Sequence, residues 1–235
     1  METYFAVLGD IVGSRAHDER ASLQDQVRSA LRSANGVLPA IQELVPTIGD
    51  EFQGLYQDLR AALEATLLVR VTLIGRADVR FGVGFGGLVL EPGPESPFGQ
   101  DGPAWWAARD AIGRAAPSVR RREAPQGLRT VFADGRELRS GRARPASSEP
   151  GEPQASPSSE ALVNAYLCCR DELVGGMDER DARLLLALLR GDSRSTAAAA
   201  EGISSSAVSQ RRIRNGSYAI ERAIRLMNEA DEWSF

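Results

Sequence analysis

The chain has 235 residues and a mass of 25.3 kDa; 43% of its residues are hydrophobic, 26% are charged, and the formal net charge is −4. This composition is typical of a globular protein and suffices for one domain of about 150 residues and a smaller one. It excludes a uniformly basic nucleic-acid-binding chain, and no apolar run reaches the ~20 residues that cross a bilayer.

The first half of the chain predicts strands and helices in alternation. Short aromatic and β-branched runs predict strands, and apolar residues at helical spacing predict helices. The expected strands are residues 4–8, 46–48, 52–56, 79–90 and 128–133, and the expected helices are 19–44 (broken at Gly36 and Pro39), 58–75 and 103–116. Gly49 and Asp50 fall in a hairpin turn, and Asp58 is placed to cap the second helix. The order indicates an α+β fold with a ferredoxin-like antiparallel sheet and helices on one face.

The second half changes character. Residues 136–160 are rich in proline, serine and glycine and predict a flexible linker. Residues 161–235 predict only helices, at about 161–173, 179–189, 195–202, 204–215 and 218–230. We therefore expect a sheet domain over residues 1–135, a linker over 136–160 and an all-α helix-turn-helix domain over 161–235. With no basic and apolar leader at the N-terminus, the chain is expected to be cytoplasmic.

Several residue types that carry enzyme chemistry are scarce or absent. The adjacent Cys168 and Cys169 cannot readily bridge each other or form a zinc site alone. His17 is the only histidine, and the absence of lysine removes Schiff-base chemistry and the phosphate-binding lysine of P-loops. Carboxylates, a metal ion and arginine remain available.

Two aspartates are expected to meet at one end of the sheet. Asp10 follows the first strand and Asp50 lies in the hairpin, which a ferredoxin-like sheet places beside that strand. Paired carboxylates favour a hard divalent cation, Mg²⁺ or Mn²⁺, that shares phosphate oxygens with a bound nucleotide. The segment after the first strand precedes a helix, so its backbone amides are expected to cradle a polyphosphate. The candidates for phosphate binding are Val12, Gly13, Ser14, Arg15 and Gly49.

Residues 9–15, 47–54, 80–86 and 101–109 together resemble the SatD family. The same blocks are similar, more distantly, to class III nucleotide cyclases and GGDEF cyclases, which share a palm-type sheet with two metal-binding carboxylates. The resemblance implies that Asp10 and Asp50 are the metal aspartates, that Ile11 lends a backbone carbonyl and that Glu51 matches the glutamate of GGDEF. It also implies that Arg109 is a catalytic arginine that stabilises the transition state.

Two positions depart from the class III pattern. Trp105 stands where an asparagine usually precedes the arginine by four residues, and Pro46 stands where a base-reading lysine usually precedes Gly49 by three. Arginine elsewhere would replace the charge of that lysine but not its geometry. The resemblance therefore implies a retained metal and phosphate half of the site and an altered base-reading and catalytic half.

Residues 195–215 resemble a helix-turn-helix. Gly202 and Ile203 are expected to form the turn, Ser204 to cap the next helix and Val208 to face the core. The candidates for DNA contact are short polar residues and a basic patch: Ser205, Ser206, Ser209, Gln210, Arg211, Arg212 and Arg214. Ile213 lies five residues after Val208, where three or four would keep one helical face. A helical bundle with a solvated arginine face is the alternative.

The leading hypothesis is a nucleotide- and magnesium-binding cytoplasmic regulator with a DNA-binding end. A homodimer is expected, because one helix-turn-helix reads only one half-site. Its contacts would come from apolar positions of 161–173 and 218–230, and a flexible linker would leave signalling to the oligomer. One alternative is a Mg²⁺-dependent nucleotidyl cyclase or transferase acting on a nucleoside triphosphate, with Arg109 neutralising phosphate charge. A non-catalytic scaffold is the other, and no membrane partner is expected.

Overall fold

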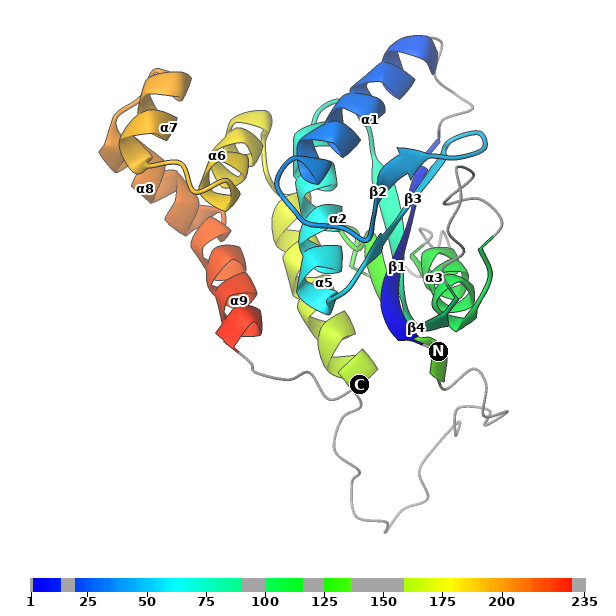
Figure 1. Cartoon of the computed structure of the whole chain (residues 1–235). Coiled ribbons are helices and arrows are strands. Elements are labelled where there is room, and N and C mark those ends of the chain that lie inside the picture. Colours follow the sequence, from blue (N-terminus) through cyan, green and yellow to red (C-terminus); the bar gives the residue numbers. More distant parts are fainter. Residues whose placement is uncertain (1, 14–19, 90–99, 116–124, 137–158, 230–235) are drawn as a thin grey trace.

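The computed structural model describes residues 2–13, 20–89, 100–115, 125–136 and 159–229 (Figure 1). Nearly all of the predicted linker, and His17, lie outside these residues. Among the described helices, none combines the length and apolar character that a membrane span requires.

A five-stranded sheet forms the centre of the first half of the chain. Its elements, in chain order, are β1 (Glu2–Ile11), α1 (Arg20–Asn35), β2 (Gln42–Pro46), β3 (Glu51–Tyr56), α2 (Leu59–Leu73), β4 (Val79–Leu88), α3 (Pro103–Arg114) and β5 (Thr130–Asp134). The strand order is β2-β3-β1-β4-β5. The first four strands, with α1 and α2, therefore have the ferredoxin-like order that the sequence predicts. The predicted cap is also present, since the Asp58 carboxylate accepts a hydrogen bond from the Ala61 amide.

The prediction of a wholly antiparallel sheet is wrong at one edge. β5 pairs with β4 in parallel, so the five-stranded sheet is mixed. A parallel neighbour requires a crossover connection, and α3 lies in that crossover.

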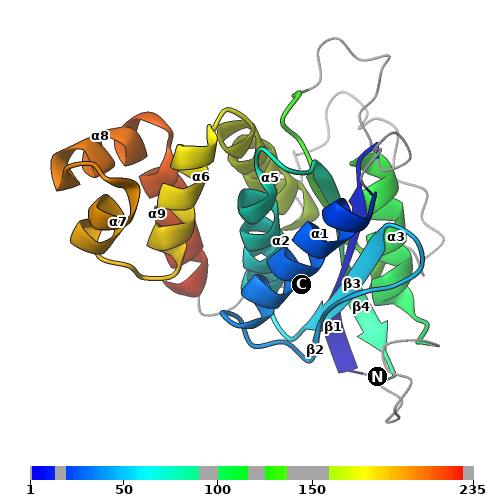
Figure 2. The same cartoon turned by 90° about the horizontal axis from the view of Figure 1, so that it is seen from above.

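The prediction that the helices share one face is also wrong. Phe5 and Val7 of β1 pack with α1 and α2, whereas Tyr4 and Ala6 on the same strand pack against α3. Side chains alternate along a strand, so α3 covers the opposite face of the sheet (Figure 2). Gly84 of β4 allows this close packing, because a Cβ there would lie 2.2 Å from the Ala104 carbonyl oxygen and from the Ala108 amide nitrogen.

Helix α5 (Ser159–Gly175) covers the β5 edge of the sheet. The amide group of Asn164 bonds both backbone groups of Phe132 at 2.9 Å, and the carboxylate of Glu160 accepts from the Asp134 amide at 3.0 Å. Val163 of α5 belongs to the main core of the sheet. The open edge of a strand exposes unpaired backbone groups, and the side chains of Asn164 and Glu160 form hydrogen bonds with several of those on β5. α5, which falls in the segment predicted as the all-α domain, thus packs against the sheet unit.

A buried charge cluster fastens α5 to the sheet unit. Asp171 is fully buried and accepts hydrogen bonds from the backbone amides of Arg129 at 2.8 Å and Thr130 at 2.6 Å. It also neutralises two buried guanidiniums, with Arg170 Nη2 at 2.9 Å and Arg70 Nη1 at 2.8 Å. Burial, the leading cause, lowers the pKa of Arg70. This cluster thus connects α2, α5 and the start of β5 through buried ion pairs and hydrogen bonds.

The remaining helices are α6 (Glu179–Leu189), α7 (Arg194–Glu201), α8 (Ser205–Arg214) and α9 (Ser217–Glu229). Of these, α6 and α9 contact α2, and α7 and α8 pack on the far side of them (Figure 1). Leu67 and Val71 of α2 form one buried cluster with Leu185 of α6 and Ile220 of α9. The terminal helices consequently contact the sheet unit directly, and Ile220, expected at a dimer contact, is buried within the chain.

Candidate functional site

Asp10 lies near the end of β1, between two other strands. In register it faces Glu51 of β3 on one side and Arg80 of β4 on the other. Asp50 immediately precedes Glu51, at the end of the turn that joins β2 to β3. Three acidic residues from two parts of the chain thus lie at one end of the sheet, where the sequence predicts Asp10 and Asp50.

The carboxylate of Asp10 has a counter-ion within the sheet. Arg80 donates to Asp10 Oδ2 from Nε at 3.0 Å and from Nη2 at 2.5 Å. The two side chains are 28% and 21% exposed, so solvent reaches the pair only partly. Because the guanidinium contacts a single oxygen, Asp10 keeps a second oxygen outside this interaction.

A second ion pair lies on the same side of the sheet. Arg109 of α3 donates from Nη1 to both oxygens of Glu51, at 2.8 and 3.0 Å. Both side chains are well exposed, at 58% for Arg109 and 41% for Glu51. The arginine that the resemblance implies as catalytic therefore reaches the carboxylate end of the sheet from α3.

Asp50 is half-buried and lines a small hollow between the hairpin and α1. The hollow has a volume of about 70 Å³ and is also lined by Gly49, Thr47 and Arg28. Gly49 has a φ of +73°, a left-handed conformation that favours glycine. Sites that enclose a small molecule usually measure about 300–1,000 Å³, so this hollow alone is too small to enclose a nucleotide.

The described residues form no preassembled metal cage. No group of three or more histidine, cysteine, aspartate or glutamate side chains is arranged among them to hold an ion. Asp10, Asp50 and Glu51 are hard oxygen donors of the kind that Mg²⁺ prefers, and Mg²⁺ usually keeps several waters beside one or two carboxylates. The donor chemistry therefore fits a magnesium ion held partly by water and phosphate.

The predicted phosphate loop is placed only in part. Ile11 is buried at the end of β1, and the Val12 amide donates to the Asp78 carbonyl at 2.8 Å. That amide is therefore already used within the chain, and Val12 is a poor phosphate donor. Gly13 is exposed, with a φ of +72°. Ser14 and Arg15 lie outside the described residues.

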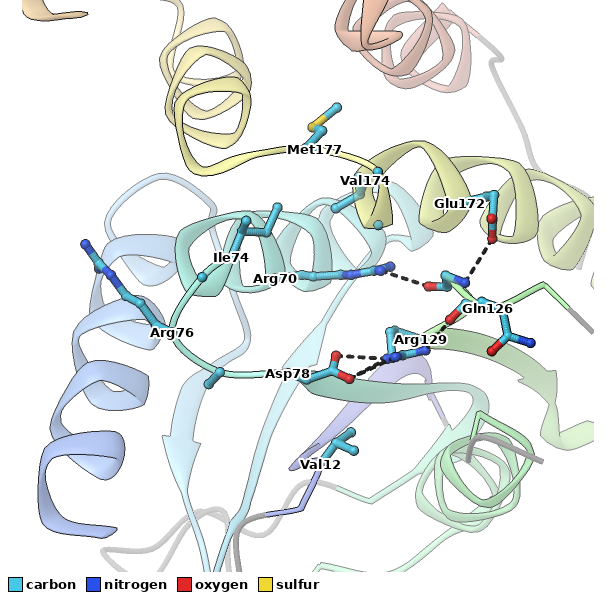
Figure 3. A pocket seen from close by; sticks show the side chains of 15 residues that line it. Val12, Arg70, Ile74, Arg76, Asp78, Gln126, Arg129, Glu172, Val174 and Met177 are labelled. Atoms are coloured by element: carbon cyan, nitrogen blue, oxygen red, sulfur yellow. Dashed lines mark hydrogen bonds and ion pairs between the residues drawn. The ribbon is translucent and has the colours of Figure 1, made fainter. Parts of the chain in front are cut away.

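A larger cavity lies where the sheet unit meets the α5–α6 connection (Figure 3). Its volume is about 630 Å³, and Val12, Ile74 and Met177 contribute apolar wall. Arg129 within it is fully engaged: it bonds the Asp78 carboxylate at 2.8 Å and two backbone carbonyls. The hydrogen bond that Arg129 donates to the Asp78 carboxylate is the leading cause that raises the pKa of Arg129. In Figure 3, Arg129 and Asp78 neutralise each other, whereas Arg70 and Glu172 bond the backbone of Gly127.

The α7–α8 pair has the predicted turn but not the predicted basic patch. Gly202 ends α7 in the left-handed conformation, and Ser204 caps α8 by accepting from the Ala207 amide. Arg212 is buried and donates to the Leu184 carbonyl at 3.0 Å. Arg211 is held by Asp178 and Asp181 of the α6 N-terminus. Both predicted DNA contacts therefore have partners within the chain, and only Arg212 is buried.

The outward residues of α8 are mostly uncharged. Ser205, Ser206, Gln210 and Arg214 are exposed, and Ser209 is half-buried. Ile213 is 68% exposed and does not belong to the buried face of α8. Val208 and Arg212, which are four residues apart, form that face, so the five-residue spacing from Val208 to Ile213 needs no further explanation. Of the predicted DNA contacts, the serines, Gln210 and Arg214 remain accessible.

Sequence reasoning missed Arg80 as a site residue. The position of Arg80 could have been predicted from the strand order, because a ferredoxin-like sheet places β4 beside β1. The side chains of paired residues on neighbouring strands point to the same face of the sheet. An arginine at the first polar position of β4 then falls opposite an aspartate at the end of β1.

Comparison with known proteins finds a family resemblance in the first half of the chain. The model of the SatD family matches residues 4–116, from β1 to the end of α3. No curated protein matches the chain.

Three solved structures that the chain resembles are cyclases. A bacterial light-regulated adenylyl cyclase has 14% identity and a TM-score of 0.43, over 56% of this chain and 75% of that one. An adenylate/guanylate cyclase/hydrolase from Silicibacter pomeroyi has 24% identity and a TM-score of 0.37, over 47% and 69%. The guanylyl cyclase Cya2 has 14% identity and a TM-score of 0.35, over 48% and 70%.

Proposed function

We propose that the sheet domain, whose residues 4–116 match the SatD family model, binds a nucleoside triphosphate together with Mg²⁺ and that the protein is a regulator. One observation carries the proposal. Asp10 and Glu51 lie opposite each other at one end of the sheet and pair with the guanidiniums of Arg80 and Arg109, and Asp50 directly precedes Glu51 at the end of the hairpin turn.

The two kinds of charge suit the two parts of this ligand. The carboxylates would hold the divalent cation, which would neutralise phosphate oxygens when bound. Arg109 is exposed and would bind phosphate oxygens with its planar set of N–H donors. Phosphates that reach Arg109 would compete with Glu51 for it, so the ligand would loosen the contact between α3 and the hairpin.

Helix α2 offers a direct route from the nucleotide domain to the terminal helices. Leu63 and Leu68 of α2 belong to the core shared with β1 and β4, whereas Leu67 and Val71 pack with α6 and α9. A movement of the sheet would therefore be felt by α6 and α9 within one chain.

Thermal denaturation with nucleotides tests the proposal. A ligand at a hundred times its Kd stabilises the folded state by about 2.7 kcal/mol, which raises the Tm of a chain of this size by about 5–11 °C. We expect that rise for one of the four nucleoside triphosphates with Mg²⁺ in wild type, and its loss in Asp10→Asn and Asp50→Asn. Asp192→Asn, which removes an exposed carboxylate from the loop before α7, is the matched control. No Tm rise with any nucleotide would leave only the scaffold hypothesis.

The alternative hypothesis, a cyclase or nucleotidyl transferase, is tested by a separate measurement of catalytic turnover. It rests on Arg109, which approaches the carboxylates and would stabilise charge on the reacting phosphates. Release of pyrophosphate in the presence of Mg²⁺, abolished by Arg109→Ala, would favour turnover. Binding without release of pyrophosphate favours the regulator.

We propose in addition that the α7–α8 pair contacts DNA, with α8 as the recognition helix. The tight turn at Gly202 and the exposed polar residues of α8 support this proposal. An operator-shift assay tests it with Gln210→Ala/Arg214→Ala, and Arg32→Ala on α1 is the control of equal charge change. A shift that is as strong in the double variant as in wild type would remove α8 from the DNA interface. Arg211 and Arg212 are unsuitable for this test, because their substitution would disturb the packing of α8.

A further inference from the structure

The acidic end of the sheet is already neutralised by the chain itself. Arg80 pairs with Asp10 across neighbouring strands, and Arg109 pairs with Glu51 across the space between α3 and the hairpin. The four side chains come from β1, β3, β4 and α3. Each arginine therefore occupies a carboxylate that a divalent cation would need.

These ion pairs match a cation bound together with an anion. A divalent cation alone would have to compete with the positive guanidinium of Arg80 for Asp10. A polyphosphate alone would meet carboxylates that repel it. When both arrive, the carboxylates turn to the cation and the guanidiniums to the phosphates, so that every charge again has a partner of opposite sign.

We propose that Arg80 is a positioning residue that makes cation binding at Asp10 depend on a polyphosphate ligand; this inference rests on the proposed function. In the absence of phosphate, Arg80 holds Asp10 and suppresses binding of the cation. In its presence, the guanidinium moves to phosphate oxygens and releases the carboxylate. The pair is only partly exposed, so the competition is screened less than it would be between fully solvated side chains.

The proposal predicts a specific pattern of affinities. An ion pair worth about 1 kcal/mol corresponds to about a fivefold change in a binding constant. We therefore expect Arg80→Gln to bind Mn²⁺ alone at least about fivefold more tightly than wild type. The same substitution is expected to reduce the gain in Mn²⁺ affinity that inorganic tripolyphosphate produces in wild type.

The experiment measures free Mn²⁺ by electron paramagnetic resonance on the full chain, with and without tripolyphosphate. Because tripolyphosphate itself binds Mn²⁺, each titration is corrected with a protein-free one. Arg76→Gln, in the loop before β4, removes the same charge away from Asp10 and is expected to behave as wild type. Arg80→Lys keeps the charge and is expected to restore weak binding of Mn²⁺ alone. Circular dichroism checks that each variant is folded.

The outcomes separate this inference from the proposed function. If wild type binds Mn²⁺ with tripolyphosphate and Arg80→Gln binds Mn²⁺ alone no more tightly than wild type, Arg80 does not gate the cation, and the inference is overturned while the proposed function stands. If Arg76→Gln raises the affinity as much as Arg80→Gln, the effect is one of net charge, and the inference is again overturned. If neither wild type nor Arg80→Gln binds Mn²⁺ under any condition, both fail together.

Discussion

Removal of the Asp171 charge is expected to be among the most destabilising single substitutions in the chain. Asp171 is fully buried and faces the guanidiniums of Arg70 and Arg170 and two backbone amides. In Asp171→Asn, the two buried arginines lose their neutralising carboxylate, and the new side-chain NH₂ group faces donors. Breaking a buried pair in this way costs about 3–5 kcal/mol, out of a typical total stability of about 5–15 kcal/mol.

Urea denaturation at neutral pH measures this loss directly from the midpoint and the slope of the transition. The same loss lowers the Tm by roughly 6–20 °C. Glu172→Gln is the matched control, because Glu172 is exposed and accepts one hydrogen bond from the Gly127 amide at 2.9 Å. It is expected to cost less than about 1 kcal/mol. A loss in Asp171→Asn as small as in this control would refute the reasoning that the cluster holds α5 on the sheet.

Two further predictions concern the packing of α3 and the terminal helices. Gly84→Ala would place a Cβ against the α3 backbone, so we expect its free energy of unfolding to fall by about 1–3 kcal/mol and its nucleotide binding to weaken. Gly113→Ala is the control, because no atom lies near its Cβ position, and urea denaturation should show it to be neutral or slightly stabilising. The pKa of Glu201 is lowered by the Arg183 hydrogen bond, and the pKa of Asp178 is lowered by the Asp181 amide and then by Arg211. Carboxylates with a lowered pKa stabilise the fold only while they are ionised. The stability of the terminal helices should therefore stay constant from pH 7 to about pH 5 and decrease once the pH drops below 4.5, the ordinary pKa of a glutamate. Unfolding followed by circular dichroism across this range checks the direction, and Glu201→Gln should flatten the fall.

The sheet order could be predicted from the sequence because the pattern of elements restricts the topology. Alternating strands and helices leave few arrangements, and the ferredoxin-like order places Asp10 beside the hairpin that carries Asp50. The face covered by α3 was missed although a signal existed. Gly82, Gly84 and Gly86 recur at every second position of β4, and such a glycine row marks close approach of another backbone.

Buried polar residues account for most of what sequence reasoning missed. Glu160, Asn164 and Asp171 share one face of α5 and pair with the edge of the sheet, yet a polar face normally predicts exposure to solvent. Arg212 lies four residues after Val208 on the buried face of α8, but its charge suggested a DNA contact. Partners that lie far away in the sequence decide such cases, and residue spacing within one helix does not reveal them.

The site itself was predicted as a set of cation ligands, whereas its internal counter-ions were not. The ferredoxin-like order sets β1 beside β3 in antiparallel pairing, so the grouping of Asp10, near the end of β1, with Glu51, at the start of β3, was accessible from the sequence. The pairing of Arg109 with Glu51 depends on the face that α3 covers, and that face was predicted incorrectly. An error in the fold thus became an error in the electrostatics of the site.

The location of a bound ion tests the central claim most directly. Crystals grown with Mn²⁺ and a non-hydrolysable nucleoside triphosphate analogue would show the ion by its anomalous scattering. The account predicts a peak about 2.1 Å from carboxylate oxygens of Asp10 and Asp50, with phosphate oxygens completing the coordination. Bound nucleotide with no ion between these two aspartates, or an ion held elsewhere on the chain, would contradict it.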